Sequence, residues 1–265
     1  MRQSRQAAGR GANTDAAPKG SGLFETVRTI VYALVIAALV RTFAFEPFNI
    51  PSGSMIPTLL VGDYLFVSKW SYGYSKFSFP FSPDLFSGRI PDRLPHRGDV
   101  AVFRYTRDTS TDYIKRIVGL PGDHVQVRDG QLYVNNTLVP RQDEGDYVAR
   151  DEQGRELAGR VYEEELPGSG GRGPVKHRIL RLTDEGSQNN TPDYQVPAGY
   201  FFAMGDNRDD SADSRFMDDL GFVPLENLVG RARIIFFSYD ARHPVWEFWY
   251  WPAEIRWNRL LMGVR

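Results

Sequence analysis

A hydroxyl that could act as a nucleophile lies in residues 50–59, where two serines and a glycine stand between two prolines in an otherwise apolar run. Proline fixes φ and removes a backbone donor, and glycine permits close backbone approach, so the run predicts a rigid, non-helical turn that aims Ser54. The alternative is a surface turn whose serines only cap a short helix. The spacing is not that of an α/β-hydrolase elbow, so a base for Ser54 must come from elsewhere in the chain.

A candidate base is Lys115, in the strand-like run of residues 112–123. Its neighbours Ile114 and Ile117 favour burial, and if alternation turns Lys115 inward, desolvation lowers its pKa. A lysine whose pKa approaches neutrality is a neutral amine that can take a proton from a hydroxyl. The polar loop of residues 205–215 follows an apolar strand and carries hydroxyls and charges that could orient this lysine.

Histidine is the competing base. The chain has four histidines, and each lies in a turn or a flexible polar stretch without H-E-x-x-H spacing: His96, His124, His177 and His243. A Ser-His-Asp triad stays open, because triads assemble in space from any chain order. We expect structural or solvated histidines, and no metal site.

Composition limits the remaining function classes. The chain has 265 residues with a 42% apolar share, enough for a sizeable core in one or two domains. Its net charge of −1 provides no basic field for phosphate backbones, so we expect no nucleic-acid partner. Cysteine is absent, which excludes disulfides, cysteine nucleophiles and cysteine-ligated metals but leaves the compartment open.

The N-terminal part predicts a membrane anchor. Residues 1–22 are interpreted as a disordered basic tail that stays in the cytoplasm, and residues 23–45 as one transmembrane helix with Arg28 and Arg41 near the interfaces. A cleaved signal peptide is the first alternative, but Arg41 lies where a peptidase would require an uncharged residue. A buried core helix is the second, because the uncharged stretch alone is too short to span a bilayer.

The rest of the chain predicts a mostly β fold. Turns followed by β-branched or aromatic runs predict strands, and Asp129-Gly130 and Asn135-Asn136 predict tight hairpin turns. The expected strands lie at residues 64–67, 100–105, 124–127, 132–134, 178–182 and 200–204. Residues 72–95 predict an irregular loop. The acidic, glycine-rich residues 141–173 are interpreted as a solvated insertion without chemistry of its own.

With the serine turn, the lysine run and the polar loop in hand, the sequence resembles the bacterial type I signal peptidases, membrane-bound endopeptidases with a Ser/Lys dyad. The resemblance covers the predicted membrane helix and, in the family's order, residues 51–69, 97–105, 113–135 and 205–224. It implies these roles: Ser54 as nucleophile, Lys115 as general base, Ser52 as an oxyanion-hole hydroxyl beside the Ser54 N–H, Ser211 as the residue that orients Lys115, Asp213 with Arg215 as a bracing salt bridge, and Met55 as a neighbour of the nucleophile.

The resemblance also implies the fold and the cellular setting. We expect antiparallel sheets that form a catalytic domain of residues 46–139 and 194–265, with a variable subdomain of residues 140–193. The implied substrates are signal peptides of exported preproteins, the other partners are membrane lipids, and no cofactor is expected. The enzyme would be a single-pass protein of the bacterial cytoplasmic membrane with its catalytic domain on the outer side.

The sequence departs from the family pattern locally. It has one candidate membrane helix where some members have two, a short insertion, and a long link at residues 216–220. An alternative to the enzyme is a membrane-anchored β-domain that binds a partner protein without catalysis. A self-cleaving Ser/Lys repressor would need a DNA-binding helix-turn-helix, which is not apparent here.

The C-terminal segment allows two interpretations. Four of the five tryptophans lie in residues 246–257, interleaved with arginines. They are typical of a final strand and short helix packed on the core. They are equally typical of an interfacial segment in which Arg256 and Arg259 meet anionic lipids.

Overall fold

The structure is a computed structural model, and it describes residues 22–79, 82–84, 86–150, 153–240 and 246–265. The predicted basic tail, apart from its last residue, and His243 lie outside the described residues. The chain divides into two compact units, one ending at Leu39 and one running from Val40 to Arg265.

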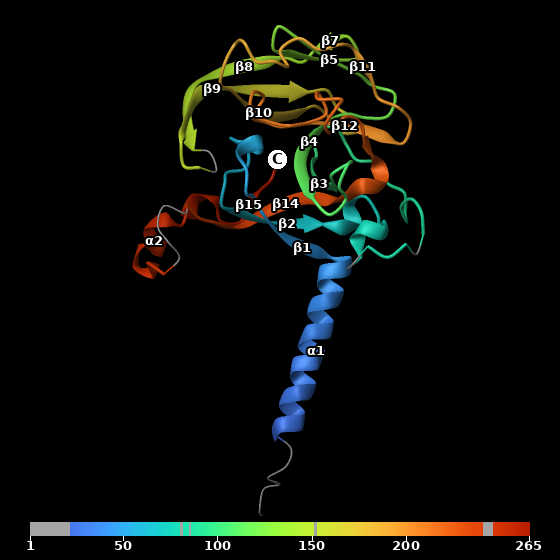
Figure 1. Cartoon of the computed structure of the whole chain (residues 1–265), viewed down its shortest axis with the longest axis vertical. Coiled ribbons are helices and arrows are strands. Elements are labelled where there is room, and N and C mark those ends of the chain that lie inside the picture. The colour runs from blue at the N-terminus through green and yellow to red at the C-terminus, as the bar shows by residue number, and fades with distance from the viewer. Residues whose placement is uncertain (1–21, 80–81, 85, 151–152, 241–245) are drawn as a thin grey trace, which may run out of the picture. The chain divides into compact units, whose positions relative to one another are not determined.

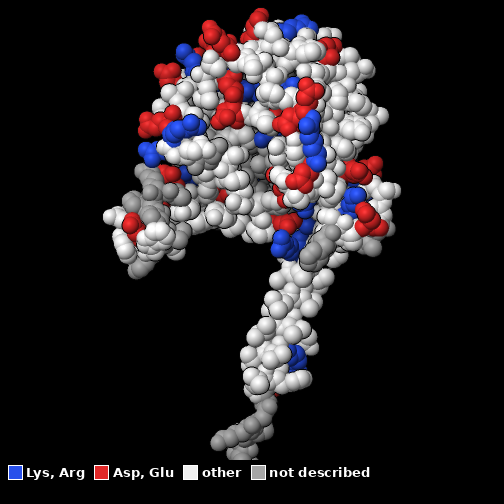
Figure 2. Space-filling model, viewed as in Figure 1, with Lys and Arg blue, Asp and Glu red and all other residues white. Residues whose placement is uncertain are grey.

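The helix α1 runs from Gly22 to Phe43 and is long and apolar enough to cross a membrane. Its 22 residues rise by about 33 Å. Glu25 in the first turn and Arg41 in the last complement the helix dipole. The space-filling view shows almost no charge on its surface (Figure 2). The predicted span of residues 23–45 ends too late, because Pro47 favours extended backbone before it and a strand begins at Phe45.

The remaining described residues are mostly antiparallel β-structure, as the sequence predicts (Figure 1). The largest sheet has eight strands within the described residues, in the order β1-β2-β14-β3-β4-β12-β13, with β15 paired to β14. Its strands are β1 (Phe45–Asn49), β2 (Asp63–Ser68), β3 (Val100–Arg104), β4 (Asp112–Gly119), β12 (Tyr200–Met204), β13 (Val223–Pro224), β14 (Leu228–Ser238) and β15 (Met262–Gly263).

A four-stranded sheet follows β4 along the chain, in the order β11-β5-β6-β7 within the described residues. Its strands are β5 (His124–Arg128), β6 (Gln131–Val134), β7 (Thr137–Leu138) and β11 (Tyr194–Gln195). The predicted hairpins are confirmed: Asp129 and Gly130 join β5 to β6, Asn135 and Asn136 join β6 to β7, and all four have positive φ.

Residues 141–173, interpreted as a solvated insertion, contain two strands of a folded three-stranded sheet, so that interpretation is wrong; the third strand overlaps the one predicted at residues 178–182. The described strands are β8 (Arg141–Arg150), β9 (Glu156–Leu166) and β10 (Val175–Arg181), in the order β10-β9-β8. The face that carries Glu163 and Glu165 is partly solvated, and the opposite face is buried, with Leu166 and Ile179 fully inaccessible. Leu180 faces the other way and packs in a cluster with Ile56 and Val161. Period-2 alternation gives a strand both a charged outer face and an apolar inner one.

The core beneath the serine turn consists of side chains from several strands. Met55 and Leu59 of the turn are fully buried against Leu65 and Val67 of β2, and Ile235 of β14 belongs to the same cluster. Truncation of one such side chain costs about 2–5 kcal/mol. The segment that carries Ser54 is therefore anchored in the core on both sides.

The C-terminal segment combines features of both interpretations. It contains the helix α2 (Trp251–Glu254), and β15 pairs with β14. Arg259 is buried and its Nε lies 3.0 Å from Asp63 Oδ1, so the proposed contact of Arg259 with lipid is wrong. Trp246, Trp249 and Trp257 are instead 71%, 60% and 62% exposed.

Candidate active site

The serine turn of residues 50–59 contains a 3₁₀ turn at Gly53–Met55, preceded by extended backbone at Ser52. The Ile56 N–H donates to Gly53 O at 3.1 Å, and the Leu59 N–H donates to Met55 O at 2.9 Å. Because Met55 is packed in the core, the turn holds Ser54 at a fixed position, where the residue is 9% exposed. The family's neighbour role for Met55 agrees with this packing.

Lys115 reaches this turn from a strand that lies later in the chain. It lies in the middle of β4, where its Cα is paired with Ala101 of β3, and it is 5% exposed. Its Nζ is hydrogen-bonded to Ser54 Oγ at 2.6 Å. Strand alternation turns this side chain inward between Ile114 and Arg116. Two residues that are 61 positions apart in the sequence thus meet in a buried pair.

The surroundings of Lys115 disfavour its charged form. Burial is the largest effect, and together with the positive charge of Arg215 it outweighs the acidic groups nearby, Asp213 first among them. The pKa of Lys115 is lowered to about 8. An amine with this pKa is partly unprotonated near neutral pH and can accept a proton.

Asp213 and Arg215 form the salt bridge that the resemblance implies. Two bonds of 2.8 Å join the guanidinium to the carboxylate, and the Gly205 N–H donates to Asp213 Oδ2 at 2.9 Å. Burial raises the pKa of Asp213, but Arg215 and the Gly205 hydrogen bond outweigh this effect and lower it below the ordinary value. The charge of Asp213 is therefore already compensated where it faces Lys115.

Ser211 lies at the site but does not make the implied contact. It is buried, and among the described residues its Oγ has no hydrogen-bond partner, so it does not bond to Lys115 in this structure. A Cβ at Gly205 would stand 2.2 Å from Ser211 Oγ and 2.5 Å from Ser54 O. Only glycine at position 205 allows the polar loop to pack this closely against Ser54.

A cleft of about 560 Å³ opens over Ser54 and Lys115. It is lined by the end of β1, the serine turn, the first half of β4 and the polar loop: Phe48–Ser54, Val102, Thr111–Lys115, Asp210 and Ala212. Strand β12 pairs with β4 only from Arg116 onward. Within the described residues, one edge of β4 over residues 112–115 is thus unpaired and can bond to an extended peptide.

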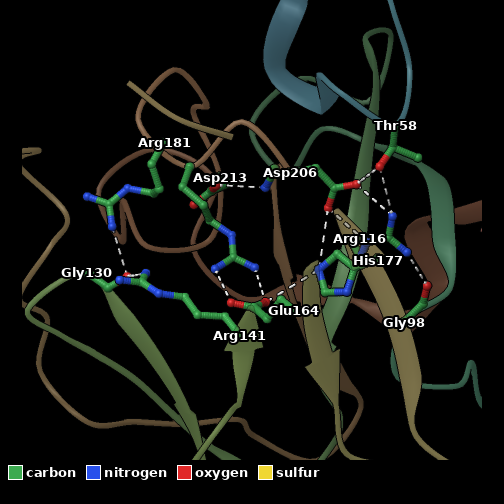
Figure 3. Close-up of polar contacts among 12 residues, drawn as sticks. Thr58, Gly98, Arg116, Gly130, Arg141, Glu164, His177, Arg181, Asp206 and Asp213 are labelled. Carbon is green, nitrogen blue, oxygen red and sulfur yellow. Dashed lines mark hydrogen bonds and ion pairs between the residues drawn. The ribbon is translucent and has the colours of Figure 1, made fainter. Parts of the chain in front are cut away.

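A buried ionic cluster next to Ser54 and Lys115 was not predicted from the sequence. Arg116 is fully buried and donates two hydrogen bonds to Asp206, from Nε to Oδ1 at 2.8 Å and from Nη2 to Oδ2 at 2.6 Å. Arg208 is bound to Glu164 of β9 through two nitrogens. Figure 3 shows His177 of β10 between the acids, with its Nε2 3.4 Å from Glu164 Oε2. The sequence did contain a signal for this cluster: a strand that turns Lys115 inward presents the neighbouring Arg116 to the opposite face, where it would need an acidic partner.

The placement of His177 in a turn or flexible polar stretch is wrong, and of the two expected kinds it is a structural histidine rather than a solvated one. It lies within β10 and is buried, and burial together with Arg116 and Arg208 lowers its pKa well below the ordinary value. His124 begins β5 and lies 2.9 Å from Asp193 at the surface. Among the described residues, no histidine is hydrogen-bonded to Ser54. No group of three or more His, Asp or Glu side chains is placed to hold a metal ion in the part of the chain described here.

Comparison with known proteins identifies the family. The model of the family described as signal peptidase, peptidase S26, matches residues 23–237. The chain belongs to this family. The resemblance stated from the sequence is thus confirmed, and the chain is a serine endopeptidase. The apolar helix α1 fits a membrane-anchored member of the family.

Individual relatives are similar in sequence over most of the chain. A signal peptidase I of Rickettsia typhi is 41% identical over 216 residues, which cover 79% of this chain and 78% of the relative. One of Rickettsia rickettsii is 42% identical over 251 residues, covering 89% and 91%. One of Rickettsia bellii is 38% identical over 251 residues, covering 89% and 84%.

Proposed function

We propose that this chain is a membrane-anchored endopeptidase that removes signal peptides from exported preproteins, with Ser54 as nucleophile and Lys115 as general base. The observation that carries the proposal is the 2.6 Å contact between Lys115 Nζ and Ser54 Oγ. The family membership supports the substrate class, and the lowered pKa of Lys115 supports the direction of proton transfer.

The reaction begins when the neutral amine of Lys115 takes the hydroxyl proton of Ser54. Oγ attacks the scissile carbonyl carbon, and the negative charge moves to the carbonyl oxygen. The Ser54 N–H and the hydroxyl of Ser52, which lines the cleft, donate to this oxyanion. The ammonium of Lys115 then protonates the leaving amine of the mature protein.

Deacylation repeats the same proton transfers with water. Lys115, neutral again, takes a proton from a water molecule that attacks the ester, and returns a proton to Ser54 as the signal peptide leaves. Asp213 and Arg215 hold the loop beside the amine without adding net charge to it. Deep burial keeps bulk water from stabilising the ammonium.

The substrate binds as an extended strand against β4. Residues 112–115 offer their unpaired edge, and the serine turn forms the opposite wall of the cleft. Main-chain hydrogen bonds of this type fix the register of a peptide without reading most of its side chains. This property suits an enzyme that must accept many preproteins.

The basic tail and α1 set the topology that we propose. A positively charged N-terminus stays in the cytoplasm, so a single span delivers the β-rich unit to the outer side of the bacterial cytoplasmic membrane. Signal peptides of exported preproteins present their cleavage sites at that side. The other partners are membrane lipids around α1.

The test is cleavage of a preprotein in detergent by the full chain and its variants. Ser54→Ala and Lys115→Ala should each lower kcat by about 10³-fold or more while the fold survives. Lys69→Met is the matched control, because Lys69 is also buried but is bound to Glu46 at 2.9 Å rather than to Ser54. The control should keep most of its turnover.

Retention of more than a few per cent of activity in Lys115→Ala would refute the dyad. The absence of cleavage by the wild-type chain would favour the alternative function, a membrane-anchored β-domain that binds a partner protein.

A further inference from the structure

Asn207 contacts the backbone of the nucleophile turn at two points. It is fully buried, and its backbone N–H donates to the backbone carbonyl oxygen of Ser54 at 3.1 Å. Its side-chain Nδ2 donates to Gly53 O at 3.3 Å. The Gly53 carbonyl therefore accepts hydrogen bonds both from Asn207 and from the Ile56 N–H.

The Gly53 carbonyl has a particular relation to catalysis. The Gly53 C=O and the Ser54 N–H belong to one planar peptide unit and point in opposite directions. A donor that fixes the carbonyl oxygen also fixes where the N–H points. Hydrogen bonding to the oxygen polarises the same unit and strengthens the N–H as a donor. In the proposed function this N–H donates to the oxyanion.

Asn207 is held in place by charged neighbours on both sides. Asp206 is bound to Arg116 of β4, and Arg208 is bound to Glu164 of the inserted sheet. Figure 3 shows Arg116, Asp206 and Glu164 in this cluster. These buried pairs leave the segment little freedom to move away from the turn.

The inserted sheet also contacts the backbone on either side of Asn207. The Leu180 N–H of β10 donates to Asp206 O at 2.8 Å, and the Arg208 N–H donates to Leu180 O at 2.9 Å. Residue 207 thus forms a parallel bridge with β10. The inserted sheet is in this way part of the support of the active site.

We propose that Asn207 is a positioning residue that fixes the Gly53–Ser54 peptide unit so that the Ser54 N–H faces the oxyanion. The proposal rests on the proposed function, since it assigns the aim of the nucleophile's own N–H. It predicts an effect on the transition state rather than on substrate binding.

The test compares Asn207→Ala with Asn227→Ala in the full-length protein. Asn227 is a matched control, because it is also buried and also donates through Nδ2 to one carbonyl, Arg104 O at 3.0 Å. Single-turnover rates, KM and the thermal midpoint are measured for both. Asn207→Ala should lower the rate about three- to tenfold with KM unchanged. Asn227→Ala should lower only the thermal midpoint.

A pH profile separates this role from an effect on the base. The midpoint of the acidic limb, set by Lys115, should not move in Asn207→Ala. A moved midpoint, a raised KM or an unchanged rate would each overturn the proposal. Ser54→Ala is run alongside: if it stays active the proposed function fails, whereas a dead Ser54→Ala with an unchanged Asn207→Ala removes only this inference.

Asn207→Leu guards against a folding defect. The leucine side chain fills a similar volume but has no hydrogen-bond donor. Asn207 Oδ1 has no hydrogen-bond partner among the described residues, so the substitution removes no bond at that oxygen. The rate loss should match that of Asn207→Ala. Failure of both variants to fold would overturn the proposal, because Asn207 would then serve folding rather than catalysis.

Discussion

Replacement of Lys115 by methionine should abolish turnover and stabilise the fold. Folding moves this amine from an ordinary pKa of 10.5 to about 8, so burial of its charged form costs stability. The difference corresponds to about 3 kcal/mol at pH 7, where both folded and unfolded chains carry the charge. Methionine fills a similar volume without that cost.

The pH dependence tests the cause of this gain. The folded pKa lies below the unfolded one, so between pH 8 and 10.5 the unfolded chain binds the additional proton and the wild type gains stability as pH rises. The advantage of Lys115→Met should shrink to below about 1 kcal/mol at pH 10. Urea unfolding in detergent, followed by tryptophan fluorescence, measures both values.

A surface lysine provides the control for this experiment. Lys176 is exposed and paired with Glu163 at 2.6 Å, so Lys176→Met should give no such gain. A Lys115→Met protein that is no more stable than the wild type at pH 7, or equally favoured at both pH values, would refute the reasoning.

Three further predictions concern chemistry and the membrane. Ser52→Ala should lower kcat by about 10²–10³ with KM little changed, whereas Ser52→Thr keeps the hydroxyl and should lose much less; equal losses would indicate a packing role. Because the neutral amine is the working form, the single-turnover rate should rise with pH through about 8, and Lys115→Arg should be inactive; a flat rate from pH 6 to 9 would contradict this. Substitution of Trp246, Trp249 and Trp257 by serine in a protein that lacks residues 1–43 should weaken binding to anionic liposomes; equal binding would exclude an interfacial role.

The features that could be predicted from the sequence are those set by local rules. The paired turn residues at 129–130 and 135–136 require positive φ, and the hairpins form there. The apolar run of α1 and its flanking charges identify a helix of membrane length. Ser54 and Lys115 could be selected as candidates because proline-flanked turns and strand alternation restrict where a side chain can point.

The buried acid of the inserted sheet could not be predicted because the acids of this segment look alike in the sequence. Residues 163–165 are three consecutive glutamates, yet strand alternation sends Glu163 and Glu165 outward toward Lys176 and Glu164 inward toward Arg208. Only the tertiary partner distinguishes the middle acid from its neighbours. Burial of Glu164 costs free energy unless a cation faces it, and that cation lies 44 positions away.

Partners also distinguish two adjacent basic residues of β4, Lys115 and Arg116. Lys115 and Arg116 point to opposite faces of one strand, and both are buried. Arg116 meets Asp206 and forms two short contacts with it. Lys115 meets Asp213, whose charge Arg215 has already balanced, so burial dominates and the amine loses its proton readily. In the proposed function, the strand therefore supplies both a cation that supports the loop and the amine that acts as the base. An arginine keeps its charge throughout the physiological pH range by its own chemistry, whereas the charge of a lysine depends on its surroundings.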